Sequence, residues 1–426
     1  MEMYKKDGNK KLRYGFTTGS CSAAAAKAAA WMLFSGTEKS EIEIMTPKGL
    51  AYTPLINDIV RSRDAVSCSV TKDGGDDPDV TNGMPVIASV SLDPESSVFT
   101  AKHDWENVQF PRENESAPES AGDPPEQTDD VRKSADRTMK SAKRRVYIDG
   151  GFGVGRVTKP GLDQPVGNAA INHVPREMIT KEVGEVCRLF DYSGNIYVEI
   201  SLPEGERLAK KTFNPRFGIQ GGLSVVGTTG VVEPMSTQAL LDTIRVELKQ
   251  KKALDGERVI ISPGNYGQDF MLRTYGYNLD ESVKCSNFIG LTLEMAAELG
   301  FKKLLLVGHV GKLIKVAGGI MNTHSREGDC RMEIIAACAL RAGADADLAR
   351  EILGCISTEE AVRILIESGL CKETMKIAMD HILPNLERRA GDDLQVDCMM
   401  YTNDAGLLAM SEGAEAWFAK KEEETI

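Results

Sequence analysis

The sequence predicts an α/β protein in which an N-terminal α+β domain is followed by a Rossmann-like domain with a parallel sheet. The chain has 426 residues, more than one ordinary core organises, so two domains are expected. After about residue 255, short apolar strands alternate with helical segments, as in a doubly wound sheet. Before that point, strands follow one another with fewer helices. We place the boundary after the glycine-rich run 218–235, which gives domains 1–235 and 236–426.

Composition restricts the class of protein. The hydrophobic fraction is 42%, the charged fraction is 27%, and the net charge is −12, which argues against nucleic acid as a partner. The N-terminus lacks the apolar core of a signal peptide, and no apolar run reaches membrane-spanning length. Nine scattered cysteines contain no C-x-x-C pair, so we expect free thiols and a cytoplasmic protein with no membrane partner.

The first helix is expected in the alanine-rich segment 22–33, because alanine has the highest helix propensity. Thr17, Thr18 and Ser20 precede it in a Thr-Thr-Gly-Ser turn. Hydroxyls and free N–H groups at a helix N-terminus suit an anion. An ordinary capped helix explains the same pattern equally well, and the two interpretations remain open.

Strands are expected next at 41–45, 51–57, 66–71 and 86–92. Between the last two, the turn 72–79 contains four aspartates, but their spacing is not that of an EF-hand loop. Hydrogen bonding within the turn, or to a substrate, is favoured over calcium. The segment 94–143 is rich in Ser, Glu, Asp, Pro and Lys, so we expect a disordered surface insertion there.

The sheet resumes at 145–148 and runs into the glycine-rich stretch 149–156. This stretch is not a dinucleotide fingerprint, because Pro160 follows where a helix should begin, and a loop close to a ligand is the better interpretation. A helix over 175–186 and a strand over 197–202 complete the first domain. Ser236 or Thr237 then caps a helix that runs to Lys249.

The second domain is expected to begin its sheet at 259–261 and to continue it at 304–307 and 394–400. Helices are expected up to Gly300, over 332–342, and after a capping box formed by Ser357 and Glu360. Residues 406–419 are expected to form a last helix-like segment.

Two strands of the second domain end in glycine-rich loops, at 263–267 and 308–312. Side by side at the carboxyl edge of a parallel sheet, they would form a crevice for a nucleoside-like ligand. A P-loop is excluded because Leu313, which has no hydroxyl, follows Lys312. A metal hydrolase is disfavoured because the five histidines form no H-x-x-x-H pair, and no G-x-S-x-G elbow indicates a serine nucleophile.

Long runs of the chain resemble one family. They read LRYGFTTGSCSAAAAKAA, GGDDPDVTNG, IDGGFGVGRVTKPGL, VGNAAINHVPREMI, GGLSVVGTTGVVEPMS, PGNYGQDF, KCSNFIG and VGHVGKLIKVAGGIMNTHS. Together they are similar to the CbiD family of anaerobic cobalamin biosynthesis, from Leu12 to about Arg341. The departures are the 94–143 insertion, Asn82 and His173.

The resemblance implies a methyltransferase that methylates C1 of cobalt-precorrin-5B to give cobalt-precorrin-6A. It implies S-adenosylmethionine as the methyl donor and a tetrapyrrole acceptor whose cobalt belongs to the substrate, so that no protein metal site is expected. Methyl transfer to an already nucleophilic ring carbon needs alignment and exclusion of water more than a strong base.

Within the matching runs, residue chemistry suggests three roles. The candidate proton acceptors are His309 and His324. The candidate cofactor-binding residues are Gly264, Asn265, Gly267, Asp269, Gly308 and Gly311. The candidates for binding substrate carboxylates are Arg13, Thr17, Thr18, Ser20, Lys159, Arg176, Lys312, Lys315 and Arg326.

Two other functions use the same features. A nicotinamide-dependent oxidoreductase would occupy the same crevice, and a non-catalytic corrinoid-binding protein would hold the tetrapyrrole without turnover. Transfer of a labelled methyl group separates them. The oligomeric state is left open by the sequence, a homo-oligomer included.

Overall fold

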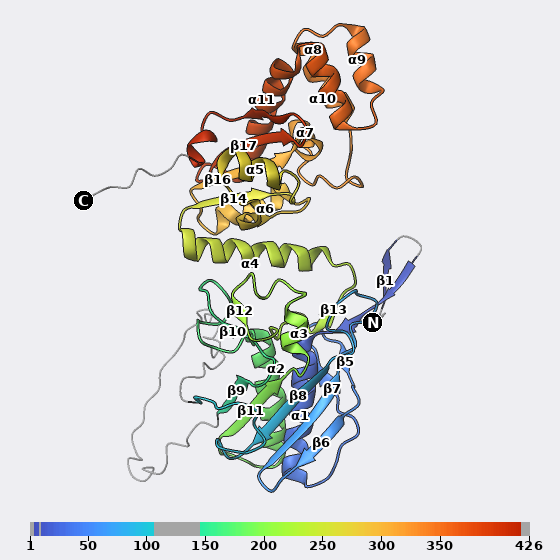
Figure 1. The fold of residues 1–426 in the computed structure, drawn as a ribbon. Coiled ribbons are helices and arrows are strands. Elements are labelled where there is room, and N and C mark those ends of the chain that lie inside the picture. The colour runs from blue at the N-terminus through green and yellow to red at the C-terminus, as the bar shows by residue number, and fades with distance from the viewer. Residues whose placement is uncertain (1–3, 8–9, 106–144, 419–426) are drawn as a thin grey trace, which may run out of the picture. The chain divides into compact units, whose positions relative to one another are not determined.

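The computed structural model describes residues 4–7, 10–105 and 145–418. The chain divides into two compact units, Met1–Met235 and Ser236–Ile426 (Figure 1). Each unit has its own sheet and its own hydrophobic core. The mixture of sheets and helices confirms the predicted α/β class.

The first unit is built on a five-stranded sheet. Its strands lie in the order β6 (Asn57–Arg61), β7 (Ala65–Thr71), β8 (Pro85–Ser91), β11 (Ile196–Ser201) and β9 (Val146–Gly150). Neighbours from β6 to β11 are antiparallel, whereas β9 is parallel to β11. This mixed sheet agrees with the α+β organisation expected for the first half.

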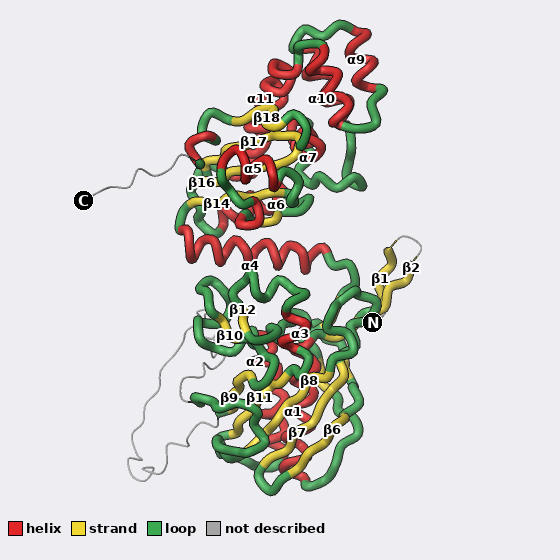
Figure 2. The backbone as a smooth tube through the Cα atoms, viewed as in Figure 1, coloured by secondary structure: helices red, strands yellow, loops and turns green. Residues whose placement is uncertain are grey.

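Two helices cover one face of this sheet, α1 (Thr18–Ser35) and α2 (His173–Leu189) (Figure 2). The alanines of α1 are fully buried, because small side chains let the helix approach both α2 and the strands. The helix ends at Gly36, which has a φ of 72°.

The remaining elements of the first unit are short. They are β1 (Tyr4–Asp7), β2 (Lys10–Arg13), β3 (Gly15–Phe16), β4 (Ile44–Met45), β5 (Ala51–Tyr52), β10 (Arg156–Val157), α3 (Gly205–Ala209), β12 (Ile219–Gln220) and β13 (Val231–Val232). β10 pairs with β12, so the glycine-rich stretch 149–156 leads from one sheet into another and not into a helix.

The surface insertion does not begin at Pro94. Residues 94–105 form hydrogen-bonded turns in which Trp105 is buried and donates its indole N–H to the carbonyl of Pro94 at 3.0 Å. This aromatic anchor stands in a polar composition that by itself favours disorder. The part of the predicted insertion from residue 106 to 143 lies outside the described residues.

The second unit contains another five-stranded sheet, in the order β15 (Val283–Lys284), β14 (Arg258–Ser262), β16 (Lys303–His309), β17 (Gln395–Thr402) and β18 (Gly406–Met410). The first four strands are parallel, and β18 is antiparallel to β17. In chain order the strands therefore lie 2-1-3-4-5, a doubly wound arrangement.

Both faces of this sheet are covered. Leu304 and Leu306 point into the larger core, and Leu305 and Val307 into a smaller one, which explains why β16 is continuously apolar. The helices are α4 (Thr237–Asp255), α5 (Gln268–Tyr275), α6 (Ile289–Glu298), α7 (Val310–Ala317), α8 (Arg331–Arg341), α9 (Ala346–Leu353), α10 (Thr358–Glu367) and α11 (Cys371–Ala390), with 3₁₀ turns η1 (Leu279–Glu281) and η2 (Glu415–Trp417). The larger core takes buried side chains from α4, α6 and α7–α11, and the smaller core from α5.

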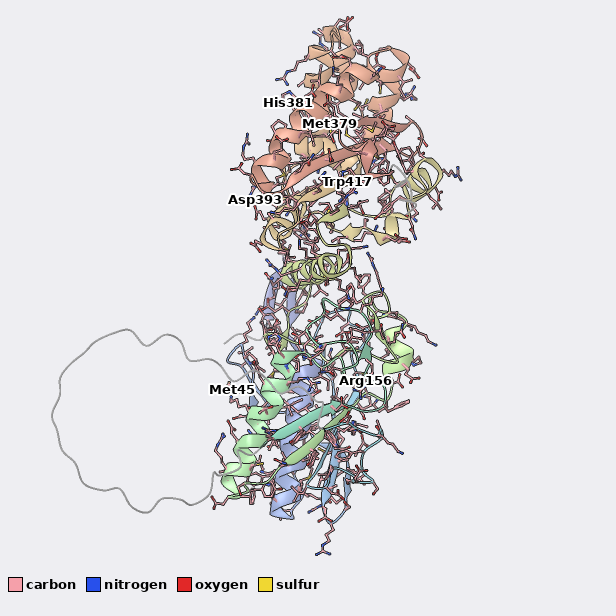
Figure 3. All side chains as sticks on the ribbon, turned by 90° about the vertical axis from the view of Figure 1, so that its left-hand side faces the viewer. Met45, Arg156, Met379, His381, Asp393 and Trp417 are labelled. Atoms are coloured by element: carbon pink, nitrogen blue, oxygen red, sulfur yellow. The ribbon has the colours of Figure 1, made fainter. Side chains whose placement is uncertain are left out.

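The helix expected over 406–419 was wrong. Residues Gly406–Met410 form the edge strand β18, with Met410 opposite Met399 of β17. Only η2 is helical, and its Trp417 (labelled in Figure 3) donates to a carboxylate oxygen of Asp397 at 2.8 Å. Pairing with an existing strand outweighs local helix propensity at this edge.

Among the residues that the structure describes, no helix combines the length and the apolar character that crossing a membrane requires.

Candidate active site

The strand order of the second unit predicts where a ligand crevice would open. β15 is added on one side of β14 and β16 on the other, so the order in which strands are added to the sheet reverses between β14 and β16. Loops that leave the carboxyl ends of two such strands turn to opposite faces and leave a hollow between them. These are the ends at which the sequence placed its two glycine-rich loops.

The loop after β14 is fixed at its base and at its far end. Ser262 is buried and shares a 2.7 Å hydrogen bond with Ser282. Gly267 begins α5 with a φ of 88°, and the ring of Tyr401 covers it. Gly264, by contrast, has open space where a side chain would be. The loop therefore offers bare backbone at Gly264, while Gly267 is required for packing.

Replacing Gly267 with alanine is expected to destabilise the protein by about 2 kcal/mol. The new Cβ would lie 2.0 Å from a ring carbon of Tyr401, in a left-handed backbone conformation. Gly264→Ala is the matched control and should change the free energy of unfolding by less than about 0.5 kcal/mol. Urea unfolding of the two variants measures both values; equal losses would contradict this account.

The loop after β16 places His309 at the start of α7. Its Nδ1 accepts a hydrogen bond from the N–H of Gly311 at 3.2 Å, and its Nε2 lies 3.3 Å from a carboxylate oxygen of Glu359. The imidazole lies near the rings of Tyr266 and Tyr401, at centroid distances of 6.2 and 5.9 Å. Burial lowers the pKa of His309, and Glu359 opposes part of that effect.

Because its pKa is lowered, His309 is neutral near pH 7. Because Nδ1 accepts from the backbone, the neutral ring carries its proton on Nε2, next to Glu359. This ring can accept a second proton on Nδ1 only when the hydrogen bond from the N–H of Gly311 breaks or the side chain rotates. Glu359 would stabilise the protonated form when that happens.

Lys312 joins three loops at the same edge. Its ammonium group donates to the amide oxygen of Asn287, which follows β15, and Thr323 donates to the same oxygen at 3.3 Å. The N–H of Thr323 also donates to the carbonyl of Asn287 at 2.9 Å. Burial lowers the pKa of Lys312. The structure thus brings the runs KCSNFIG and VGHVGKLIKVAGGIMNTHS together.

Other predicted residues of this unit lie differently. Lys315 is buried, and its ammonium group donates to the carbonyls of Thr323 and Gly328, so it fastens the loop that follows α7. His324 and Arg326 are exposed on that loop, where the N–H of Arg326 donates to Nδ1 of His324. Asp269 is exposed in the first turn of α5.

The glycines and the amide of the predicted cofactor set are not equivalent. A side chain at Gly308 would meet Leu313 at 2.9 Å, so this glycine is needed for packing. At Gly311 the nearest neighbours, Thr358 and His309, are more than 3 Å away. The carbonyl of Asn265 accepts from the N–H of Gln268, and its side chain is exposed.

The hydroxyl cluster before α1 is buried in the first unit. Thr17 caps the helix by accepting from the N–H of Ser20 at 3.2 Å, and Ser20 donates to the carbonyl of Gly230 at 2.6 Å. The N–H of Gly19 donates to the carbonyl of Val226. The protein itself therefore uses the hydroxyls of Thr17 and Ser20, and Thr18 is buried beside them. The substrate-binding role of Thr17, Thr18 and Ser20 stays a prediction that the geometry does not support.

The cations predicted in the first unit are separated. Arg13 forms a two-pronged ion pair with Asp73, at 2.6 and 2.7 Å. Lys159 is exposed and donates to the carbonyl of Arg216. Arg176 is buried at the start of α2 and lines a cavity. Of the three, Arg176 is the one that lines this cavity.

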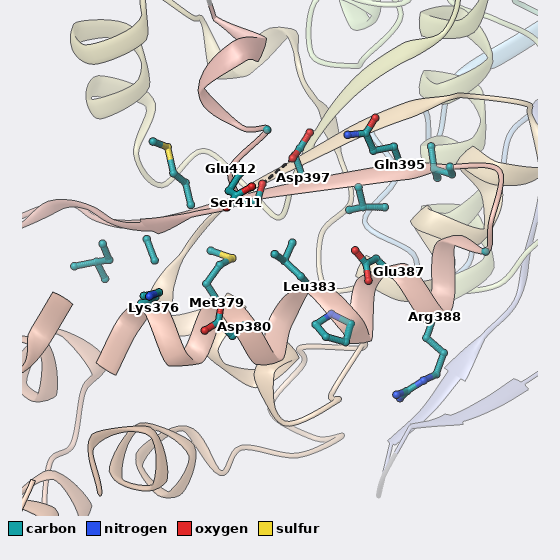
Figure 4. Close-up of a pocket in the computed structure, with 18 of the residues that line it drawn as sticks. Lys376, Met379, Asp380, Leu383, Glu387, Arg388, Gln395, Asp397, Ser411 and Glu412 are labelled. Atoms are coloured by element: carbon teal, nitrogen blue, oxygen red, sulfur yellow. Dashed lines mark hydrogen bonds between the residues drawn. The ribbon is translucent and has the colours of Figure 1, made fainter. Parts of the chain in front are cut away.

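A groove lies elsewhere in the second unit. It has a volume of about 970 Å³ and lies between α11 and the strands β17 and β18 (Figure 4). On its strand side, Ser411 donates a 2.7 Å hydrogen bond to Asp397. It contacts Gln395, where β17 begins, whereas the crevice lies where β17 ends. Parallel sheets typically bind ligands at the carboxyl ends of their strands, so those strand ends stay the predicted ligand site.

Within residues 4–7, 10–105 and 145–418, no group of three or more His, Cys, Asp or Glu side chains is arranged to hold a metal ion.

Sequence reasoning missed three residues of the crevice: Tyr266, Tyr401 and Glu359. Tyr266 stands inside the glycine-rich loop and is 71% exposed, so its position was a usable signal. Tyr401 and Glu359 come from β17 and the first turn of α10, far from the loops in sequence. Only the fold brings them to His309.

Comparisons with known proteins agree with one another. A family model described as CbiD matches residues 5–104 and 107–234, and a model described as the CbiD C-terminal domain matches residues 322–412. A protein of Ruminiclostridium cellulolyticum is 40% identical over 403 residues, which cover 95% of this chain and 92% of the relative. One of a Thermoanaerobacter species is 37% identical, with 98% and 100% covered. Both are named cobalt-precorrin-5B C(1)-methyltransferase.

A solved structure also matches, that of a cobalamin biosynthesis protein (cbiD) from Archaeoglobus fulgidus. It is 22% identical, with a TM-score of 0.35, and the match covers 76% of this chain and 86% of the other.

Proposed function

The chain belongs to the CbiD family, and on that premise we propose that it methylates C1 of cobalt-precorrin-5B to give cobalt-precorrin-6A. The observation that carries this function is identity of 37–40% over nearly the whole length of relatives that bear that name. The enzyme is accordingly a methyltransferase of cobalamin biosynthesis. The donor, the site residues and the handling of the substrate are our further proposals.

S-adenosylmethionine is the proposed donor, and it would supply the methyl group from a sulfonium centre. The crevice between β14 and β16 has the features that such a ligand needs. The backbone at Gly264 is open, the exposed ring of Tyr266 offers a face for a cation or an adenine, and Asp269 provides a nearby negative charge. Gly264, Asn265, Gly267, Asp269, Gly308 and Gly311 remain the proposed cofactor set.

The chain's own residues have three tasks. Lys312 offers a cation at the edge of the crevice, and partial burial makes its charge more effective toward a substrate carboxylate. His309 holds a position from which a neutral ring can take a proton. The rings of Tyr266 and Tyr401 limit access of water to His309. The cobalt belongs to the substrate and needs no ligand from the protein.

Of the two histidine candidates, the geometry favours His309. His324 is exposed on a loop, whereas His309 lies at the strand end beside Glu359. Lys315 and Arg326 stay in the proposed substrate set with less support, because Lys315 is committed to its own loop.

Transfer of a labelled methyl group tests the function. Protein mixed with cobalt-precorrin-5B and S-adenosylmethionine carrying a labelled methyl should yield a labelled corrinoid that is one methyl heavier. Retention of the unmethylated corrinoid, bound but unchanged, would indicate a binding protein. Exchange of hydride with a nicotinamide would indicate the oxidoreductase.

Binding of S-adenosylhomocysteine tests the donor site separately. Gly264→Leu is expected to weaken that binding at least tenfold, because a large side chain would fill the space that the backbone now leaves open. The thermal midpoint should not change. Isothermal titration of wild type, Gly264→Leu and Gly264→Ala measures the series, and an unchanged affinity in Gly264→Leu would place the donor elsewhere.

A further inference from the structure

Two carboxylates lie side by side inside the first unit. Asp149 on β9 and Glu199 on β11 are partners in the parallel register, and their side chains are 5% and 0% exposed. They project to the face of the sheet away from α1 and α2, since Ile148, Val198 and Ile200 fill the core on the helical face. Adjacent buried like charges are unfavourable unless cations neutralise them.

His103 lies between these two carboxylates. Its Nδ1 is 2.8 Å from Asp149 and its Nε2 is 2.7 Å from Glu199, and the side chain is 1% exposed. A neutral imidazole has one N–H, so donation to both acceptors requires the imidazolium form. Burial alone would lower the pKa of His103, but the bonds to Asp149 and Glu199 outweigh burial and raise it to about 9.

The remaining oxygens of the pair are also occupied. Glu199 accepts from the N–H and the hydroxyl of Thr100, from the N–H of Ala101 and from the hydroxyl of Ser201. Asp149 accepts two 2.9 Å bonds from the guanidinium of Arg156. Asp149 is therefore neutralised from both sides, and Arg156 is held in one orientation.

A cavity of about 460 Å³ opens beside this network. It is lined by Lys102, Asp104, Asp149, Arg156, Gly167, Asn168 and Arg176. The three cations come from three parts of the chain: the turn before residue 106, the start of β10 and the first turn of α2.

Arg176 is the unusual member of this lining, because it is buried without a carboxylate partner. It is 2% exposed, and it donates to the carbonyls of Ile171 and Ile148 at 2.8 and 2.7 Å. Within the described residues no carboxylate lies at ion-pair distance from it. Burial lowers its pKa to about 10. A guanidinium has five N–H donors, so donors remain that the two carbonyls do not use.

Arg176 lacks a direct anionic partner. Asp149 and Asp163 raise its pKa through their negative charge, but among the described residues neither forms an ion pair with it. A buried guanidinium without such a contact is costly. An anionic group in the cavity would supply one.

We propose that this cavity binds one carboxylate of the tetrapyrrole substrate, with Arg156 and Arg176 as donors and Lys102 at its exposed edge, an inference that rests on the proposed function. Acetate and propionate side chains of a tetrapyrrole have the required charge and planar oxygens, and guanidinium groups match that geometry. His103 acts here as a positioning residue, because it holds Asp149, which in turn holds Arg156.

The binding test uses a cobalt corrin with free carboxylates and the same corrin with its carboxylates esterified. Arg156→Met should raise the Kd for the free acid about 10- to 100-fold, and Lys102→Met about 3- to 10-fold. Neither should alter the Kd for the ester. Arg207→Met is the control, because Arg207 is a surface cation of the same unit that pairs with Glu204, and its Kd should stay within twofold.

Folding and function are separated in the same experiment. Lys102 is exposed and makes no ion pair among the described residues, so Lys102→Met tests the cavity even if Arg156→Met unfolds. An unchanged Kd for the free acid in both variants overturns the carboxylate site and leaves the methyltransferase standing. If the wild type binds the free acid but transfers no methyl group, and the variants selectively lose free-acid binding, the site is supported and the proposed function is refuted.

Discussion

Replacing His103 with glutamine should lower the free energy of unfolding of the first unit by about 3 kcal/mol at pH 6.5. Glutamine has no charge, so Asp149 and Glu199 would remain as neighbouring buried carboxylates with one cation fewer. Removing one partner of a buried charge network costs more than the net value of the pair, because the remaining charges stay desolvated.

The effect should depend on pH with a defined sign. The pKa of His103 is raised to about 9 in the folded protein, above the ordinary value of 6.5. The folded state therefore binds this proton more tightly, and the stabilisation is complete below pH 6.5 and is lost as pH rises through about 9. The difference between wild type and His103→Gln should fall below about 1 kcal/mol by pH 10.

Urea unfolding followed by the fluorescence of Trp105 measures this difference, because its ring centroid is 4.4 Å from that of His103. Replacing Trp31 and Trp417 with phenylalanine leaves Trp105 as the one tryptophan of the chain. His173→Gln is the matched control: its side chain is 60% exposed and also contacts one aspartate, so it should cost less than about 1 kcal/mol. Equal losses in the two variants, or a loss that does not change with pH, would refute the charged bridge.

Replacing His309 with glutamine should lower kcat for methyl transfer by about 10²- to 10⁴-fold, the range typical of a lost general base. Binding of S-adenosylhomocysteine should change little, because glutamine still offers a side-chain acceptor to the N–H of Gly311. His381→Gln is the control, since His381 lies on α11 (labelled in Figure 3), outside the crevice. A loss confined to KM would instead assign His309 to binding.

The pH profile of kcat identifies the group. Burial lowers the pKa of His309 below 6.5, so the neutral, proton-accepting form predominates at pH 7 and kcat should fall only at more acidic pH. Glu359 favours the protonated ring, so Glu359→Gln should move this acid limb to still lower pH. A limb that moves upward, or that persists in His309→Gln, would mean that another group titrates.

Most helices and strands could be identified from the sequence, because the spacing of apolar residues and the positions of glycine and proline determine them within a short segment. The alanine run gave α1, and the apolar run at 304–307 lies within β16. The same reasoning failed at 406–419, where the local pattern suits a helix but the free edge of β17 pairs with it as a strand. It also failed at 94–105, where one buried tryptophan and one buried histidine order a polar segment.

The candidate site residues also fall into those that a local pattern suggests and those whose role depends on the fold. Gly264, Gly267, Gly308 and His309 could be proposed as site residues because glycine-rich strand ends have a local signature. Lys315 and Ser20 have equally suitable chemistry, yet both are used inside the protein. A cation or a hydroxyl in a sequence does not reveal which carbonyl will accept from it.

The sequence by itself determined the family, the α/β class and the glycine-lined strand ends, because these depend on residue type and on spacing along one segment. Only the tertiary structure decided that Glu359 and Tyr401 lie beside His309, and that His103 bridges Asp149 and Glu199 next to a cavity with an unpaired arginine. Those relations depend on strand order and register, which bring together residues up to about a hundred positions apart. Their energies come from burial and from charges a few ångströms apart, and neither is encoded in any short stretch of the chain.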